Sequence, residues 1–467
     1  MKNAIIISSI TTFLAGCLTV GPDYKAPEND QAYKIDDLTQ KNGKAIAAEN
    51  LGVWWEQFND ETLNELIKNS LTDSYTMQSA QAKVLRARAL LGVSKADYYP
   101  TLDAKGSATR GRHLSNSRGG NGTENLYSTG FDARWEIDIF GGNRRNVEAA
   151  SADLQASELN LENVWVTLAS EIATNYIGLR GYQQQLLVAQ NNLKAQEATL
   201  EILESRYKSG LTNKLDVQQA RYNMERTRST LPPLRVLIEE SLNSLAVLVG
   251  KMPGALQASL SKIEEIPDLP VKSIQSIPAN IIRQRPDVRQ AERRLAAETA
   301  RIGVAKSDLY PKFFINGSIG LEALHTENFF SNTSRYNYFG PGFSWNLFSA
   351  GAVKNRTKAQ TAVADAARAD YNNALISAVK EVRDALISHA QEQLRFDALF
   401  DAVEAAELAE QIAQDQYKNG LTDFNNVLDA QRSLFELQAR LTESEAKITV
   451  NMVRVYKALG GGWQNLK

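Results

Sequence analysis

The chain has 467 residues, and its 52 basic and 54 acidic side chains leave a formal net charge of −2. This near-balance argues against a nucleic-acid partner, because proteins that bind nucleic acids usually have a basic excess. A hydrophobic fraction of 43% excludes an intrinsically disordered chain. The single cysteine excludes a disulfide framework and a paired-cysteine metal site. The three histidines are far apart in sequence, so neither a metal centre nor a bound cofactor is expected.

The first residues are typical of an export signal. Lys2 precedes a short apolar run at residues 5–13, which is too short to span a bilayer. The following segment, Leu14-Ala15-Gly16-Cys17, resembles a bacterial lipobox. In that interpretation residues 1–16 are a signal peptide, and Cys17 becomes the first residue and carries a covalent lipid. Leu18, in place of an aspartate, favours the outer membrane; the alternative is an ordinary signal peptide with an incidental cysteine.

The chain contains an internal duplication. Residues 92–100 recur as 303–311, and residues 207–212 recur as 417–422, at offsets of 211 and 210. Each half is therefore expected to contain a helix, a Tyr-Pro break, strands, a long helix, a Gly-Leu-Thr turn and a return helix. The expected segments are an N-terminal segment at 17–60, a first repeat at 61–285, a second repeat at 286–459 and a tail at 460–467.

Alternating apolar and polar residues predict two strands after each Tyr-Pro break. The strands are expected at about 101–111, 126–140, 312–322 and 337–348. Their length and aromatic ends fit an outer-membrane barrel, and a soluble sheet with one wet face is the alternative. Four strands cannot close a barrel, and lipid does not tolerate an open edge. Either the sheet is soluble or several chains close it together.

Apolar residues recur at steps of three and four from Val147 to Tyr207, and again 210 residues later from Thr357 to Tyr417. The mean step of about 3.5 residues is that of a coiled coil, and neither stretch contains proline. Such a helix is about 90 Å long; a coiled-coil spacer is the simplest alternative. Turns are expected at 208–213 and 418–423, and the first return helix is expected to give way to an insert at about 232–285.

Several short segments resemble one known family, the TolC-like outer-membrane channels of tripartite efflux pumps, in its lipoprotein branch. They occur in the family's order from Cys17 to the C-terminus. They are Gly21-Pro22-Asp23-Tyr24, residues 54–60 from Trp54-Trp55 onward, Arg285-Pro286-Asp287-Val288-Arg289, Leu428-Asp429-Ala430-Gln431-Arg432 and residues 458–463.

The resemblance implies a mainly helical fold with a membrane β part. Three identical chains would share one 12-stranded barrel, and their long helices would form a periplasmic α-barrel with an equatorial belt. The expected function is passive export of drugs or other small toxic solutes, gated at the periplasmic tip. The implied partners are a periplasmic adaptor, an inner-membrane transporter of the RND type and outer-membrane lipid. The cargo is not readable from the sequence.

The resemblance also implies two groups of site residues near the turns. Adaptor contacts are expected at the turns themselves, where simple helix capping by glycine is the alternative role. These residues are Gly210, Leu211, Thr212, Gly420, Leu421 and Thr422. The gate is expected at Asp429, whose three copies would form an acidic ring that selects cations; an exposed helical aspartate is the alternative. Further gate candidates are Asn425, Asn426, Asp216 and Asp423.

Two other classes of protein are weighed against the channel. A trimeric surface adhesin also combines coiled coil with four strands per chain, but its strands occupy one terminal block. Here they occupy two blocks about 210 residues apart. An enzyme is disfavoured, since the sequence shows no nucleotide-binding loop, no clustered metal ligands and no nucleophile with an evident base.

Overall fold

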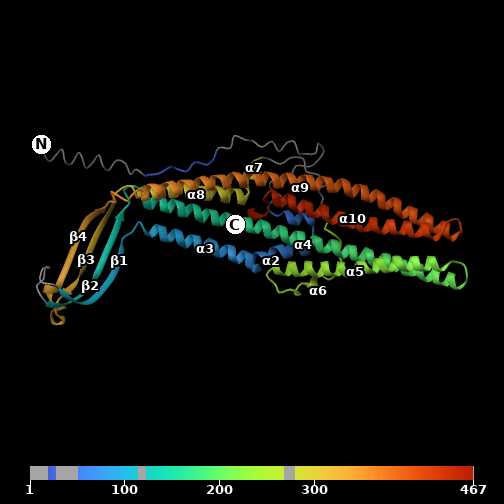
Figure 1. Cartoon of the computed structure of the whole chain (residues 1–467), viewed down its shortest axis with the longest axis horizontal. Coiled ribbons are helices and arrows are strands. Elements are labelled where there is room, and N and C mark those ends of the chain that lie inside the picture. Colours follow the sequence, from blue (N-terminus) through green and yellow to red (C-terminus); the bar gives the residue numbers. More distant parts are fainter. Residues whose placement is uncertain (1–18, 28–50, 114–121, 268–278, 466–467) are drawn as a thin grey trace. The chain divides into compact units, whose positions relative to one another are not determined.

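The computed structural model describes residues 19–27, 51–113, 122–267 and 279–465. The described chain is mainly helical with one antiparallel sheet, as expected (Figure 1). It divides into two compact units. The first consists of Met1–Glu28, Lys83–Glu158 and Gln290–Asn372, and the second of Asn29–Ala82, Leu159–Arg289 and Asn373–Lys467.

The first unit contains a four-stranded sheet in the order β1-β2-β3-β4. The strands are β1 (Thr101–His113), β2 (Gly122–Ile137), β3 (Lys312–Ala323) and β4 (Arg335–Ser344). Each strand pairs antiparallel with its neighbour in the order, and the register places Thr101 opposite Arg134 and Phe131 opposite Ile319. Within the described residues, β1 and β4 each have only one neighbouring strand, so the sheet has two unpaired edges.

The two faces of the sheet differ in polarity. One face carries large exposed apolar side chains, among them Phe131, Ile319 and Phe339. The other face carries a polar row across three strands, in which the Asp132 carboxylate pairs with Lys105 at 2.8 Å and accepts a hydrogen bond from Ser318 at 2.6 Å. This division follows from the alternation seen in the sequence.

The second and fourth strands end earlier than the alternation predicts, at Ile137 rather than residue 140 and at Ser344 rather than residue 348. Asp138 ends the second strand, because its carboxylate accepts a hydrogen bond from the N–H of Arg144 at 2.8 Å, in the first turn of the next helix. Trp345 follows the fourth strand, and its indole donates to the carbonyl of Leu309 at 3.1 Å.

The helices come in pairs of equal length. The longest are α4 (Gly142–Lys208) and α9 (Ala352–Lys418), each of 67 residues. Each is followed by a helix of 35 residues, α5 (Lys214–Leu248) and α10 (Phe424–Ala458), and preceded in its repeat by one of 22 residues, α3 (Tyr75–Ala96) and α8 (Pro286–Ser307). Short helices are α2 (Glu61–Asp73), α6 (Gln257–Leu260) and α7 (Ala279–Gln284).

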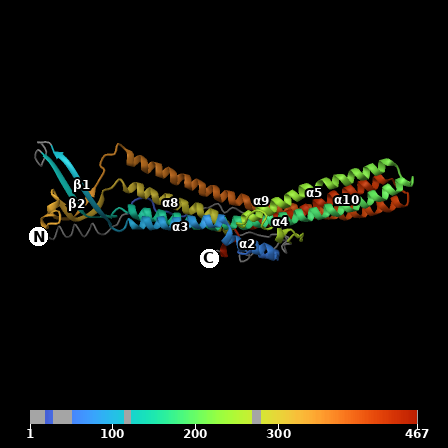
Figure 2. The ribbon, with the colours of Figure 1, turned by 90° about the horizontal axis from the view of Figure 1, so that it is seen from below.

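Helix α5 differs from the expectation, because it continues through Pro232 and Pro233 to Leu248 (Figure 2). The expected insert therefore starts only after this helix. Proline removes a backbone donor and usually ends a helix. Here the two prolines are exposed, and the helix beyond them buries Leu242 and Leu245. This burial on the far side of the prolines favours continuation of the helix.

The core of the second unit joins segments from near both ends of the chain. Trp54, in a 3-10 helix, is fully buried and stacks on Tyr456 of α10 with ring centroids 5.4 Å apart. The Tyr456 hydroxyl donates to Gln57 Oε1 at 2.9 Å. Trp165 of α4 donates to the carbonyl of Gly462 at 2.8 Å. These contacts bring residues 54–57 against the C-terminal segment.

Tyr456 makes the stability of the protein sensitive to alkali. Burial raises the pKa of Tyr456 from 10.0 to about 12. The neutral phenol stabilises the folded state fully below pH 10, and this contribution is lost as the pH rises towards 12. We expect a loss of roughly 2–3 kcal/mol over this interval, at about 1.4 kcal/mol per pH unit. Thermal unfolding followed by circular dichroism should show a weaker alkaline decline for Tyr456→Phe, whereas Tyr222→Phe, at an exposed tyrosine, should behave as wild type.

Candidate functional site

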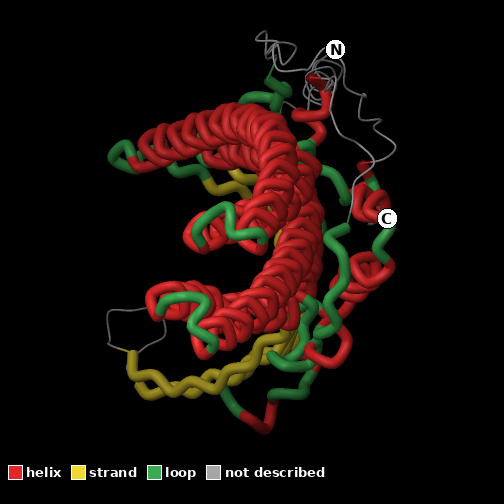
Figure 3. Tube along the Cα trace, turned by 90° about the vertical axis from the view of Figure 1, so that its right-hand side faces the viewer, coloured by secondary structure: helices red, strands yellow, loops and turns green. Residues whose placement is uncertain are grey.

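The two long helices end in matching turns, which lie at the right of Figure 1 and face the viewer in Figure 3. Gly210 and Gly420 have φ angles of +71° and +70°, a conformation that favours glycine. The N–H of Gly210 donates to Tyr207 O at 3.0 Å, and the N–H of Leu211 donates to Arg206 O at 2.9 Å. The second turn repeats both bonds, and together they form a Schellman cap. The capping role of the two glycines is thus visible in the structure.

The residues after each glycine form a second matching contact. The Thr212 hydroxyl donates to Asp216 Oδ2 at 2.6 Å. Asn426, the equivalent of Asp216, donates through Nδ2 to the Thr422 hydroxyl at 2.5 Å. The same positions are therefore bonded in both turns, with donor and acceptor exchanged. The side chains of Leu211 and Leu421 are exposed to solvent, although they are apolar.

Asp429 lies on α10, and its side chain is 69% exposed. Its carboxylate is 3.3 Å from the guanidinium of Arg432, which also donates to Asn223 Oδ1 at 3.4 Å. A ring of Asp429 carboxylates would therefore be accompanied by an equal number of arginines. Sequence reasoning missed this ion pair, although the spacing of three residues on a helix permits it.

The remaining gate candidates also lie at the beginnings of the return helices. Asp423 is the N-cap residue of α10, but its side chain makes no capping hydrogen bond. Asn425 is exposed in the first turn of α10. In contrast, Asn213 caps α5 by accepting from the N–H of Asp216 at 2.9 Å. The expected tip residues thus lie in the two turns, in the first turn of α5 and in the first two turns of α10.

An apolar cluster joins the four helices below the turns. It contains Leu200 and Leu203 from α4, Val217 from α5 and Phe424 from α10. Tyr417 of α9 packs on it, with its ring centroid 5.2 Å from that of Phe424. Because one cluster includes both hairpins, the two turns are held in one structural unit.

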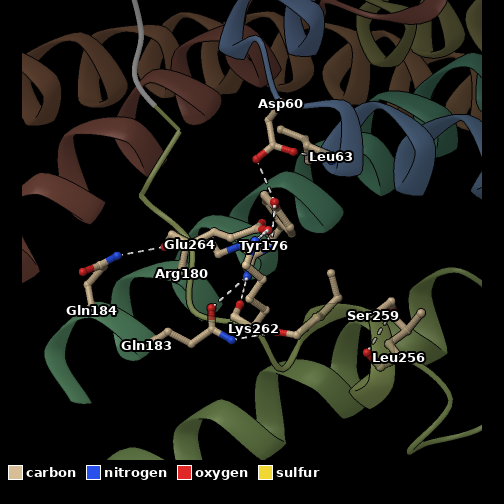
Figure 4. Close-up of polar contacts among 11 residues, drawn as sticks. Asp60, Leu63, Tyr176, Arg180, Gln183, Gln184, Leu256, Ser259, Lys262 and Glu264 are labelled. Atoms are coloured by element: carbon tan, nitrogen blue, oxygen red, sulfur yellow. Dashed lines mark hydrogen bonds and ion pairs between the residues drawn. The ribbon is translucent and has the colours of Figure 1, made fainter. Parts of the chain in front are cut away.

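A buried arginine forms a second site, which the sequence analysis did not identify (Figure 4). Arg180 of α4 is only 1% exposed. Its guanidinium donates to Glu264 Oε2 at 2.5 Å, to Lys262 O at 2.8 Å and to Gln183 Oε1 at 2.9 Å. These bonds fasten the segment that follows α6 to the middle of α4.

Tyr176 extends this site towards α2. Its hydroxyl donates to Asp60 Oδ2 at 2.7 Å and accepts from Arg180 at 3.1 Å. Burial, together with the Asp60 carboxylate, raises the pKa of Tyr176 above its usual value, so the phenol stays neutral. Asp60 also accepts from the N–H of Leu63 and so caps α2. The arrangement has the character of a structural clamp, since both terminal nitrogens of Arg180 and the hydroxyl of Tyr176 bond to other parts of the chain.

Arg285 is a similar buried arginine at the start of α8. It donates to Ala458 O at 2.7 Å and forms ion pairs with Asp287 and Glu381 at 2.7 and 2.6 Å. Burial opposes its charge, but the two carboxylates outweigh burial and raise the pKa of Arg285. The Arg-Pro-Asp segment thus ties the start of α8 to α9 and α10.

Two general features of the described residues concern membranes and metals. None of the helices in these residues is long and apolar enough to cross a membrane. No group of three or more histidine, cysteine, aspartate or glutamate side chains among them could hold a metal ion. Cys17, the expected lipid attachment point, lies outside the described residues.

A family model described as outer membrane efflux protein matches residues 66–251 and 277–461. Nodulation protein T of Rhizobium leguminosarum bv. viciae is 28% identical over 463 residues, which are 99% of this chain and 94% of that protein. The cation efflux system protein CusC of Escherichia coli is 29% identical over 460 residues, covering 97% of each.

The fold agrees with solved structures as well. The structure of the outer-membrane channel OprN has a TM-score of 0.89 at 33% identity and covers 95% of this chain and 99% of that one. The two matched segments of the family model correspond to the two halves of the duplication. The expected alternative, an adhesive surface protein, has no support in these relatives.

Proposed function

The chain belongs to the outer membrane efflux protein family, and we propose that it forms the exit duct of a tripartite pump as a homotrimer gated at its turns. An inner-membrane transporter of the RND type and a periplasmic adaptor would deliver drugs or other small toxic solutes to it. Cys17 would carry a covalent lipid that attaches each chain to the outer membrane.

The unpaired edges of the sheet are the observation that supports the trimer most directly. Strands β1 and β4 each expose one edge in the described chain, and the sheet has one apolar and one polar face. In lipid every backbone polar group needs a partner. Pairing β1 of one chain with β4 of the next, in three copies, would close twelve strands and turn the apolar side chains outward.

The matching turns supply the proposed adaptor surface. Leu211 and Leu421 are 68% and 77% exposed, and each directly follows the glycine that caps its helix. Exposed leucines that are held in place are suited to contact a partner at low entropic cost. Gly210, Thr212, Gly420 and Thr422 would set the shape of this surface.

The gate proposal is tested by the charge of Asp429. Three copies would place carboxylates around the pore, flanked by Asn425 and Asn426. Such rings favour cations. We expect Asp429→Asn to lower cation preference, because the carboxylates that attract cations are removed. We also expect a higher single-channel conductance, because cations bound by the ring no longer obstruct the pore. Planar-bilayer recordings of purified wild type and variant measure both quantities.

Asp415 provides a matched control for this experiment. Its carboxylate is 3.3 Å from Lys418, also three residues on, and it is 73% exposed. Asp415→Asn removes the same charge from the same end of the hairpins and should leave the recordings unchanged. Equal effects of the two variants would contradict the gate, and the absence of any current from inserted wild-type protein would contradict the duct.

A further inference from the structure

A cavity of about 530 Å³ lies between α4, α5 and α10 in the second unit. Volumes of this size accommodate small organic ligands. Its apolar wall includes Val188, Leu428 and Phe435, and its polar wall includes the amides of Asn192 and Gln196. The three helices belong to one chain, so the cavity is formed without a neighbouring copy.

The polar wall contains a hydrogen-bonding group without a partner. Gln196 is 7% exposed, and its Oε1 atom is buried and accepts no hydrogen bond from any described residue. Asn192 and Asn223, which also line the cavity, are each more than nine-tenths buried. A buried polar atom left unpaired costs about 1–3 kcal/mol. The helices thus carry an unfavourable polar group at the place where a ligand could satisfy it.

The internal duplication shows that these amides are not needed to build the hairpin. At the offset of 210 residues, the second repeat has Ala402 in place of Asn192 and Ala406 in place of Gln196. Helix α9 nevertheless matches α4 in length. The equivalent helix therefore forms with small apolar residues at these positions. The amides of Asn192 and Gln196 are thus not required for the helix to form.

The charges that line the cavity are mostly positive. Arg226 of α5 lines it and forms no ion pair with any described residue, and Arg432 of α10, which pairs with Asp429 at 3.3 Å, lines it as well. Glu436 is the one acidic lining residue, and Arg440, outside the cavity, neutralises it at 2.6 Å. Guanidinium groups are well suited to bind carboxylate and sulfonate groups.

We propose that this cavity is a binding site for an amphipathic organic anion. Val188, Leu428 and Phe435 would contact its apolar body, Arg226 and Arg432 would bind its anionic group, and the amides would bond its polar atoms. The proposed exit duct would then have a specific ligand site in its wall. Binding itself depends only on the geometry of one chain, and its measurement is independent of conductance.

The test uses a bromonaphthalenesulfonate as the probe, with the full protein in lipid nanodiscs. Titration calorimetry should show saturable binding. Arg226→Gln should weaken it about tenfold or more, since a hydrogen bond to a charged group contributes about 1.5–3 kcal/mol and 1.4 kcal/mol is tenfold. Arg221→Gln is the matched control, because Arg221 lies on the same helix but pairs with Glu204 outside the cavity. It should bind as wild type.

A second variant tests whether weaker binding could result from misfolding of the first variant. Asn192→Ala with Gln196→Ala introduces the residues that the second repeat already has, and it should retain helicity while binding more weakly. Crystals soaked in the probe should show the bromine between α4, α5 and α10. The proposal is overturned by unchanged binding in both variants, by bromine density without saturable binding in solution, or by a neighbouring chain that fills the cavity.

Discussion

Replacing Arg180 by methionine should destabilise the protein by about 3 kcal/mol or more. The substitution leaves the carbonyl of Lys262 and the amide oxygen of Gln183 without their donor, and each buried unpaired acceptor costs about 1–3 kcal/mol. Glu264 is half-exposed and can return to water, so it adds less. The midpoint of thermal or urea unfolding of the solubilised protein, followed by circular dichroism, measures the effect.

An exposed ion pair supplies the control for Arg180. Arg221 is 51% exposed and pairs with Glu204 at 2.7 Å. Such pairs contribute about 0–1 kcal/mol, so Arg221→Met should shift the midpoint only slightly. Proteolysis should also cut the segment after α6 faster in Arg180→Met, because its attachment to α4 is lost. Similar midpoints for the two variants would show that the buried cluster does not act as a clamp.

Replacing Gly250 by alanine should have an effect of similar size for a steric reason. Gly250 has φ of +73°, and a Cβ atom there would lie 2.1 Å from the carbonyl oxygen of Asp73. The left-handed conformation costs an alanine roughly 1–2 kcal/mol, and overpacking against backbone adds typically about 1–3 kcal/mol. We therefore expect about 2–5 kcal/mol of destabilisation in the same unfolding measurement.

A substitution at Gly210 measures the conformational cost without the cost of overpacking. This glycine has nearly the same φ, +71°, but no heavy atom beyond its two chain neighbours lies within 4 Å of the position of its Cβ. Gly210→Ala should therefore show the conformational cost alone, about 1–2 kcal/mol. If Gly250→Ala were no worse than Gly210→Ala, the close approach of Asp73 would not constrain the chain.

The features that were predicted from the sequence depend on periodic patterns. Apolar steps of three and four between Val147 and Tyr207 predicted a helix that the structure places at Gly142–Lys208. Alternation predicted four strands in two blocks, and Phe131 and Asp132 point to opposite faces as expected. These patterns are local, so a single sequence reveals them.

The features that were missed depend on contacts between distant residues. Arg180 donates to the backbone carbonyl of Lys262. Every residue has such a carbonyl, so the amino-acid sequence does not show which one accepts the bond. The row Tyr176, Arg180 and Gln183 was a usable indication, because the spacings of four and three residues place three polar side chains on one face of the helix. Pro232 suggested a helix end, but burial of Leu242 beyond it outweighed the local preference.

The equal lengths of the paired helices have a consequence for how the gene can change. Helices α4 and α9 have 67 residues each, α5 and α10 have 35 each, and all four meet in the cluster around Phe424. Deleting one heptad from α4 alone would withdraw Leu200 and Leu203 from that cluster by about 10 Å. The length of the hairpins is therefore determined by four separate segments of the gene. An insertion or deletion in one helix is expected to be tolerated only when the other three helices change by the same length.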